Sequence, residues 1–203
     1  MDTLTELHLD ALTEVFNVGA GRAAASLSEI VGDEVKLSVP AIEIKKSSEA
    51  DATVMELNSA RFGAVSQQFS GPFDAEAILL FTEEHALEIV RDMMGSQMSI
   101  EELAEFEQEA MCELGNIILN ACLSAMADML QISLNSSLPS YKIATTDEIF
   151  QGMTQSTDQP YILVLHMDLT IEKRHSEGHL IFLLSSVSLH NLKMQIDRFL
   201  GAI

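Results

Sequence analysis

The sequence predicts an α+β fold in which two similar halves form one domain about a pseudo-two-fold axis. Two long helical patterns each precede a group of strand patterns, and the halves align at an offset of 99 residues without a Gly/Ser-rich or Pro-rich linker between them. We expect a mixed, largely antiparallel sheet covered by helices, two of them long and motif-bearing. The expected single domain is 1–203, with repeats at 1–98 and 99–203.

The first repeat begins with apolar residues at steps of three and four, which predict a helix over residues 3–31 ended by Gly32. From Val35 the period changes to two and predicts a strand, with Pro40 marking a sheet edge or the strand end. Further strands are expected at 51–58, 64–70 and 76–82. Thr82, followed by two acids, then starts a helix that ends at Gly95.

The second repeat opens with a capping box, Ser99-x-x-Glu102, that predicts a helix running to Leu130. Strands are expected at 141–148, 161–172 and 178–184, followed by a closing helix at 186–200. The offset of 99 places Glu14 on Glu113, Asn17 on Asn116 and Pro40 on Pro139. The segment 78–82 also matches 181–185, at an offset of 103.

The composition is that of a globular protein with an unusual charge. Hydrophobic residues make up 47% of the 203 residues, and the net charge is −20. That charge argues against binding to nucleic acid or an anionic membrane surface and favours a basic partner. The N-terminus lacks a signal-peptide pattern, and no run of 18 apolar residues occurs, so we expect a cytoplasmic protein without membrane insertion. Cys112 and Cys122 lie on one helix, about 15 Å apart, and therefore do not pair.

Each long helix carries a narrow polar stripe along one face. The stripes consist of Asp10, Glu14, Asn17 and Gly21 in the first repeat, and of Glu109, Glu113, Asn116 and Asn120 in the second. A solvated helix face is one interpretation. A functional site is favoured because the pair recurs in both halves, because apolar neighbours surround Asn116, and because Asn is unfavourable inside a helix.

The chemistry of such a stripe suits an electrophile that is already activated. A carboxamide can hold a water molecule but is no strong base, and a nearby Glu can accept a hydrogen bond from a Lys. An aspartyl phosphate whose Mg²⁺ is bound by its own protein needs little more than an in-line water and charge stabilisation.

The segments Asp10-x3-Glu14-x2-Asn17-x22-Pro40 and Glu109-x3-Glu113-x2-Asn116-x22-Pro139 resemble the signature of the CheC/CheX/FliY family of chemotaxis phosphatases. Two motifs in a chain of this length resemble CheC most. The resemblance implies hydrolysis of the phosphoaspartate of a CheY-type response regulator in two-component signalling. It implies that Asn17 and Asn116 hold the attacking water, while Glu14 and Glu113 pair with a Lys of the regulator.

The same resemblance implies no cofactor of the protein's own, with Mg²⁺ on the partner regulator, and CheD deamidase as a possible second partner. Phe16 stands where the second motif has the small Gly115, so we expect the second site to contribute more. The alternative functions are a non-catalytic adaptor that binds the regulator or CheD, and a structural component of the flagellar switch.

Other patterns are weaker. His175-x3-His179 has metal-like spacing, but its neighbours indicate a hairpin turn, and we expect no metal site. The acids between Glu101 and Glu109 lack the glycine and alternating acids of a calcium loop. The eleven Met residues are typical of core filling, and the alternative for Met93, Met94 and Met98, which lie beside a helix end, is a docking patch.

Overall fold

The computed structural model describes residues 4–49, 61–95, 98–155, 160–171 and 174–201. Its first half contains α1 (Glu6–Val31), β1 (Val35–Lys46), the 3₁₀ turn η1 (Ser47–Glu49), β2 (Arg61–Ser70), β3 (Ala75–Thr82) and α2 (Glu83–Met94). Its second half contains α3 (Ile100–Leu130), β4 (Asn135–Ser136), β5 (Ser140–Thr145), α4 (Thr146–Gln155), β6 (Tyr161–Ile171), β7 (Arg174–Leu184) and α5 (Ser186–Gly201).

One sheet contains strands from both halves. Its order is β1-β6-β7-β3-β2, after which β4 and β5 both pair with β2. All pairings among the described strands are antiparallel, so the expectation of a mixed sheet was wrong. The α+β class is confirmed. Each described strand therefore runs opposite to the strands that it pairs with.

The sheet order reads the same from either edge when β1 is matched with β5, β2 with β6 and β3 with β7. At its centre, Ile78 of β3 lies directly opposite Ile181 of β7. These are the residues that the sequence aligns at an offset of 103. A two-fold relation between the halves would place equivalent residues opposite each other at this point. Duplication as the origin of the two halves stays a prediction.

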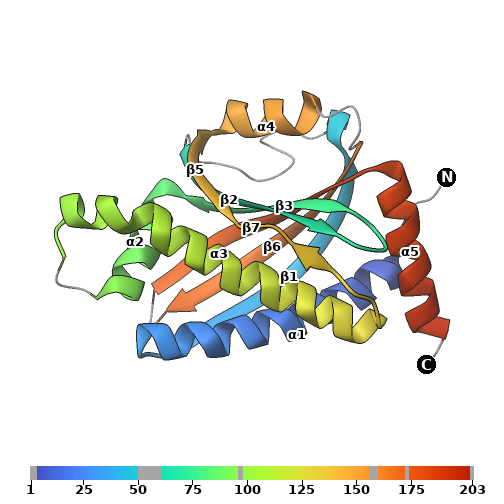
Figure 1. Ribbon diagram of the computed structural model, residues 1–203, viewed down its shortest axis with the longest axis horizontal. Coiled ribbons are helices and arrows are strands. Elements are labelled where there is room, and N and C mark those ends of the chain that lie inside the picture. The colour runs from blue at the N-terminus through green and yellow to red at the C-terminus, as the bar shows by residue number, and fades with distance from the viewer. Residues whose placement is uncertain (1–3, 50–60, 96–97, 156–159, 172–173, 202–203) are drawn as a thin grey trace.

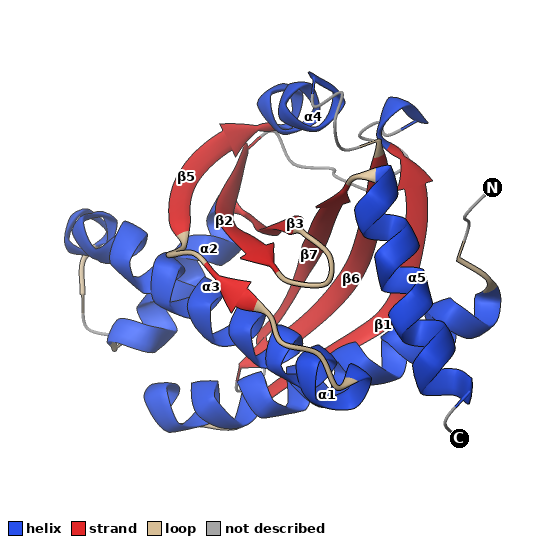
Figure 2. Ribbon diagram, turned by 45° about the vertical axis from the view of Figure 1, so that its right-hand side comes forward, coloured by secondary structure: helices blue, strands red, loops and turns tan. Residues whose placement is uncertain are grey.

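The two faces of the sheet are covered unequally. The main core lies between the sheet and the layer of α1, α2, α3 and α5, and includes the alternate residues Leu163, Leu165 and Met167 of β6. The other face carries a smaller core beneath α4, around Ile149 and Ile162. Figures 1 and 2 show α1 and α3 crossing one side of the curved sheet and α4 lying on the other. The strands therefore have apolar residues on both faces where a helix covers them.

The ends of the long helices follow their predicted signals. Thr5 and Ser99 cap α1 and α3 with complete capping boxes, and Gly32 ends α1 in the left-handed conformation, with φ of 76°. The helices α1 and α3 are in close contact at Gly19. A Cβ atom added there would lie only 2.5 Å from the Cα of Cys122 on α3. Glycine is therefore required where the two helices cross.

One predicted element was wrong in part. The strand expected at 141–148 ends at Thr145, and α4 follows from Thr146. Glu148 Oε2 accepts a hydrogen bond from the backbone N–H of Thr145, and the hydroxyl oxygen of Thr145 accepts one from the backbone N–H of Glu148. This reciprocal pair is a capping box, and it starts a helix where the strand pattern would have continued. The strand expected at 51–58 lies outside the described residues.

The helix α3 is long and apolar enough to cross a membrane by length and composition. More than half of its most apolar stretch is buried inside the fold, as is typical of the central helix of a layered domain. Both cysteines lie on this helix as free thiols, Cys122 buried and Cys112 half-buried.

Candidate functional site

The predicted site residues lie on the two long helices, at the protein surface. Glu14 and Glu113 are exposed, and Asn17 and Asn116 are half-buried. Each Glu and Asn pair occupies one face of its helix, three residues apart, as the sequence predicts. None of the four side chains is sealed in the core, so a partner can reach both stripes.

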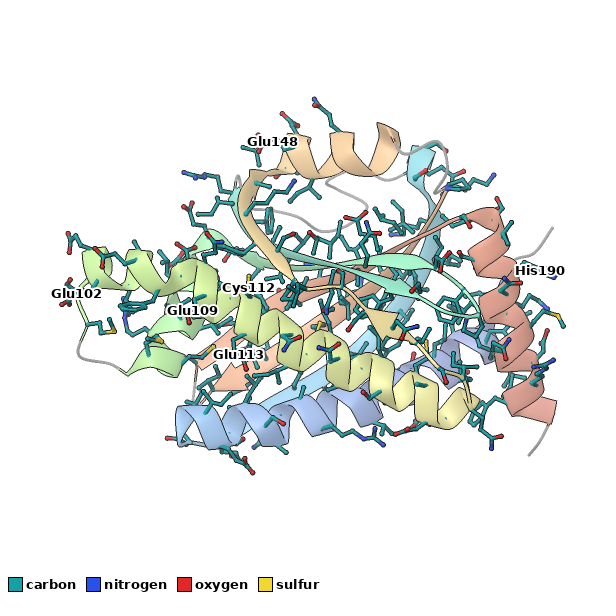
Figure 3. The ribbon with its side chains drawn as sticks, viewed as in Figure 1. Glu102, Glu109, Cys112, Glu113, Glu148 and His190 are labelled. Atoms are coloured by element: carbon teal, nitrogen blue, oxygen red, sulfur yellow. The ribbon has the colours of Figure 1, made fainter. Side chains whose placement is uncertain are left out.

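Most of the second stripe lies in a groove of about 660 Å³. Its residues Glu109, Glu113 and Asn116 line the groove together with Pro139, the last residue of the motif. Figure 3 shows Glu109, Cys112 and Glu113 extending from α3 in this region. The remaining lining is mostly apolar: Ile30 from α1, Met93 and Met94 from α2, Phe106 and Ala110 from α3, and Leu138.

This groove therefore places two acids and a carboxamide against an apolar wall. Four of the wall residues are exposed large hydrophobic side chains, namely Ile30, Met94, Phe106 and Leu138. An apolar surface that carries a few polar groups is typical of a binding site. Met93 and Met94 belong to the docking patch that the sequence indicated. Ile30 and Leu138 were missed, because packing of α1 brings Ile30 to α3 and the contacts of Ser137 with β2 place Leu138 beside it.

Within the groove, Asn116 is held by the residue one turn further along α3. The Oδ1 atom of Asn116 accepts a hydrogen bond of 2.5 Å from the Nδ2 atom of Asn120. Within the described ranges, no group accepts a hydrogen bond from the Nδ2 atom of Asn116. Its amide group is therefore a donor available to a molecule in the groove.

The first stripe differs in the hydrogen-bond partners of its asparagine, Asn17. Asn17 Oδ1 accepts a hydrogen bond of 2.9 Å from the backbone N–H of Val39, and Asn17 Nδ2 donates one of 2.9 Å to the carbonyl oxygen of Val39. The same Nδ2 also donates to the carbonyl oxygen of Thr13 at 3.0 Å. Val39 lies where the ladder between β1 and β6 is interrupted, between Ser38 and Ala41. Asn17 thus fixes the irregular part of an edge strand to α1.

The equivalent segment of the second repeat is bound to β2 and makes no hydrogen bond to Asn116 among the described residues. The residues between β4 and β5 are bound to β2, since Gln67 Nε2 donates to the carbonyl oxygen of Ser137 and the Ser137 hydroxyl accepts from the backbone N–H of Gln68. Leu138, which matches Val39, is consequently 89% exposed, whereas Val39 is fully buried. This difference leaves the groove open beside Asn116.

The expectation that the bulk of Phe16 weakens the first site was wrong. Phe16 is completely buried and packs on Phe182 of β7, with ring centroids 5.5 Å apart. Its bulk therefore fills the core and does not obstruct the stripe. Gly115 also faces the sheet, where any side chain would overlap Val65. The two sites differ instead through the hydrogen bonds of Asn17 and Asn116.

Behind the groove, the buried side chain of Glu107 accepts a hydrogen bond from the hydroxyl of Tyr141 on β5. Burial and this hydrogen bond raise the pKa of Tyr141. Burial also raises the pKa of the Cys112 thiol, whose sulfur lies 3.9 Å from the carbonyl oxygen of Pro139. The Tyr141 hydroxyl and the Cys112 thiol are therefore neutral at pH 7. The hydrogen bond between Glu107 and Tyr141 connects α3 to the strand that follows Pro139.

The only cluster of possible metal ligands in the part of the chain that the structure describes is remote from the stripes in sequence. Asp168, His175 and Glu177 lie on the β6–β7 hairpin, and His175 Nε2 is 3.7 Å from a carboxylate oxygen of each. The hairpin expected around His175 is confirmed. His179 instead lies against His166, with ring centroids 5.2 Å apart, so the two histidines of the predicted spacing do not converge.

Comparisons with known proteins show which proteins this chain is similar to. The family model described as the CheC-like family matches residues 7–44. A CheY-P phosphatase CheC from Bacillus subtilis is 25% identical over 67% of this chain, and the match covers 66% of that relative, just under two thirds of its length. These matches confirm the resemblance to the CheC/CheX/FliY family.

Solved structures share the fold. The crystal structure of Thermotoga maritima FliY is 22% identical, with a TM-score of 0.79 over 97% of this chain and 99% of that one. A chain in the crystal structure of the CheX–CheY–BeF3–Mg complex from Borrelia burgdorferi, at 12% identity, gives a TM-score of 0.52 over 83% of this chain and 96% of that one.

Proposed function

We propose, from the likeness to the CheC/CheX/FliY family and from the groove beside Asn116, that this protein is a cytoplasmic phosphatase of a phosphorylated CheY-type response regulator in chemotaxis signalling. The relative named CheY-P phosphatase supports the activity, and the neighbour solved with CheY supports a partner of that type. The single observation that carries the proposal is that Glu109, Glu113, Asn116 and Pro139 line one open groove.

The groove suits a protein substrate better than a small anion. Its charged side chains are the two acids Glu109 and Glu113, which would repel a free phosphate. A regulator brings Mg²⁺ and a Lys to its phosphoaspartate, and these positive charges compensate for the acids. Glu113 would accept a hydrogen bond from that Lys. The apolar wall would contact the regulator surface around the phosphorylated residue.

In the proposed reaction, the amide of Asn116 donates a hydrogen bond to one lone pair of a water oxygen. The other lone pair attacks the phosphorus atom in line with the bond to the aspartate oxygen. That P–O bond breaks and its electron pair returns to the aspartate carboxylate. One of the two protons of the water stays on the attacking oxygen, and the other passes to a phosphate oxygen or to solvent. The products are inorganic phosphate and the unphosphorylated regulator. Holding one water in this geometry contributes an acceleration on the order of 10²-fold.

The first site has a smaller role in this proposal, because Asn17 is bound to Val39. Glu14 is exposed and remains able to bind a Lys of the partner. We therefore assign Glu113 and Asn116 as the main catalytic pair, with Glu14 and Asn17 as the secondary pair. The alternative function is a non-catalytic adaptor that binds the regulator or CheD through the same surface.

The test measures phosphate release from a CheY-type regulator that has been phosphorylated with acetyl phosphate in the presence of Mg²⁺. The expected result is that catalytic amounts of the protein shorten the lifetime of the phosphoryl group. An adaptor would leave that lifetime unchanged or prolong it. The double variant Asn17→Ala/Asn116→Ala should bind the regulator and lose the acceleration, and full activity of this variant would refute the mechanism.

A further inference from the structure

We infer that Asn120 is a positioning residue that sets which end of the Asn116 carboxamide faces the substrate. The inference rests on the proposed function and identifies a residue outside the paired motifs. Asn120 lies one helical turn after Asn116, so both side chains occupy the same face of α3. Its Nδ2 atom donates a hydrogen bond of 2.5 Å to Asn116 Oδ1.

A carboxamide can present either its acceptor or its donor, since a rotation of 180° exchanges the two. The hydrogen bond from Asn120 occupies the oxygen of Asn116 and so leaves the NH₂ group for the groove. A donor at this point holds a water through one lone pair and leaves the other free to attack. An acceptor at this point would instead accept a hydrogen bond from the water, and the lone pairs of the water oxygen would then point in other directions.

The first repeat provides a comparison within the same chain. The residue that matches Asn120 is Gly21, which has no side chain to bind Asn17. The oxygen of Asn17 instead accepts from the backbone N–H of Val39, and both hydrogens of its amide are donated to carbonyl oxygens. The motif asparagine is thus available for a ligand where residue i+4 is Asn, and occupied where it is Gly.

The location of Asn120 supports an indirect role. It is half-buried, lies outside the groove that contains Asn116, and lines a neighbouring small cavity with Ser124 and Leu134. It therefore acts on the substrate only through Asn116. A change at Asn120 should alter the rate of the bound complex and leave substrate affinity unchanged.

The experiment compares Asn120→Ala, Asn120→Asp and wild type for kcat, KM and urea unfolding, with the phosphorylated regulator as substrate. Alanine removes the hydrogen bond, and aspartate accepts but does not donate, so it should turn the NH₂ group of Asn116 away from the groove. Both variants should lose at least ~10-fold in kcat, with KM and stability close to those of wild type. The variant Ser124→Asp, which adds the same charge at an exposed position one turn away, should keep wild-type kcat.

Either of two results would overturn the inference: kcat of Asn120→Ala within twofold of wild type, or an equal loss in Ser124→Asp and Asn120→Asp. If the wild-type protein itself released no phosphate, the proposed function would fall. The positioning contact would then be decided by NMR of the side-chain amides, where Asn120→Ala should shift the NH₂ resonances of Asn116. Unchanged resonances would refute the contact.

Discussion

The carboxamide of Asn17 and the backbone of Val39 are joined by two hydrogen bonds of 2.9 Å, one in each direction. This relationship gives the spacing of the first motif a structural meaning, because Val39 directly precedes Pro40. The second repeat keeps the spacing without the pairing, since Leu138 is turned outward and Asn116 is bound to Asn120. The two motifs are alike in sequence and different in what their asparagines contact.

The two asparagines should therefore respond differently to replacement by alanine. Asn17→Ala leaves the N–H and C=O of buried Val39 without partners and should lower the free energy of unfolding by about 2 kcal/mol. Asn116→Ala should change it by less than ~0.5 kcal/mol and reduce the phosphatase rate ~100-fold. Urea unfolding and phosphate release measure the two effects. Equal destabilisation by both variants would contradict this assignment.

The exposed rim of the groove should contribute to substrate affinity. Leu138→Ser removes an 89% exposed side chain and should raise KM several-fold with kcat unchanged, because the contact is equally present in the ground state and the transition state. Val187→Ser is the matched control, since Val187 is 69% exposed and lies on α5. Steady-state kinetics with the phosphorylated regulator distinguish them. A comparable rise in KM for both variants would show that the groove is not the docking site.

Tyr141 should make stability depend on pH at the alkaline end. Its pKa is raised in the folded state, so its contribution is complete below pH ~10 and is lost as pH rises toward the folded value. Tyr141→Phe deprives Glu107 of its donor and should cost about 1–2 kcal/mol at pH 7, with a smaller difference at higher pH. Unfolding titrations at several pH values measure this.

A spectroscopic measurement can follow the ionisation of Tyr141 separately from that of the other tyrosine. The chain has two tyrosines, so in Tyr161→Phe the phenolate absorbance reports on Tyr141 alone. That absorbance should stay low above pH 10 in the native protein and appear on unfolding. Ionisation of Tyr141 near pH 10 in the folded state would contradict the prediction.

Two glycines of α1 form a matched pair for stability. Gly21→Ala should stabilise the protein by about 0.5–1 kcal/mol, because a Cβ atom there meets nothing within 4 Å and alanine is the better helix former. Gly19→Ala should destabilise it by about 1–3 kcal/mol, because its Cβ would lie 2.5 Å from the Cα of Cys122. Thermal or urea unfolding measures the change in the free energy of unfolding for both variants. A stabilising Gly19→Ala would contradict the close contact of α1 and α3.

The sequence predicted those parts of the fold that local signals determine. Thr82, Ser99 and Gly32 mark helix ends because capping uses neighbouring residues only. The helix after Thr145 was missed although Glu148 stands at the capping-box position, because the preceding alternation resembled a longer strand. The sheet order was not predictable in detail, since it depends on pairing between residues about 100 positions apart.

Helical periodicity predicted which residues form the two stripes, but it did not predict the hydrogen-bond partners of the two asparagines. Whether Asn17 reaches Val39 depends on the interruption in the β1 ladder, and whether Leu138 turns outward depends on the contacts of Ser137 with β2. Both are tertiary features. Glu14 and Glu113 are exposed in the structure, while the apolar wall from α1 and α2 follows from helix packing, which periodicity does not reveal.

The pairing of β3 with β7 has a consequence for how the chain is made. The two middle strands of the sheet are separated by about 100 residues, so β3 leaves the ribosome long before its partner β7 exists. Until then its apolar residues and unpaired backbone groups are open to other chains. We expect nascent chains that stop short of residue 174 to need chaperone protection, and full-length chains to be released from it once β7 has been translated.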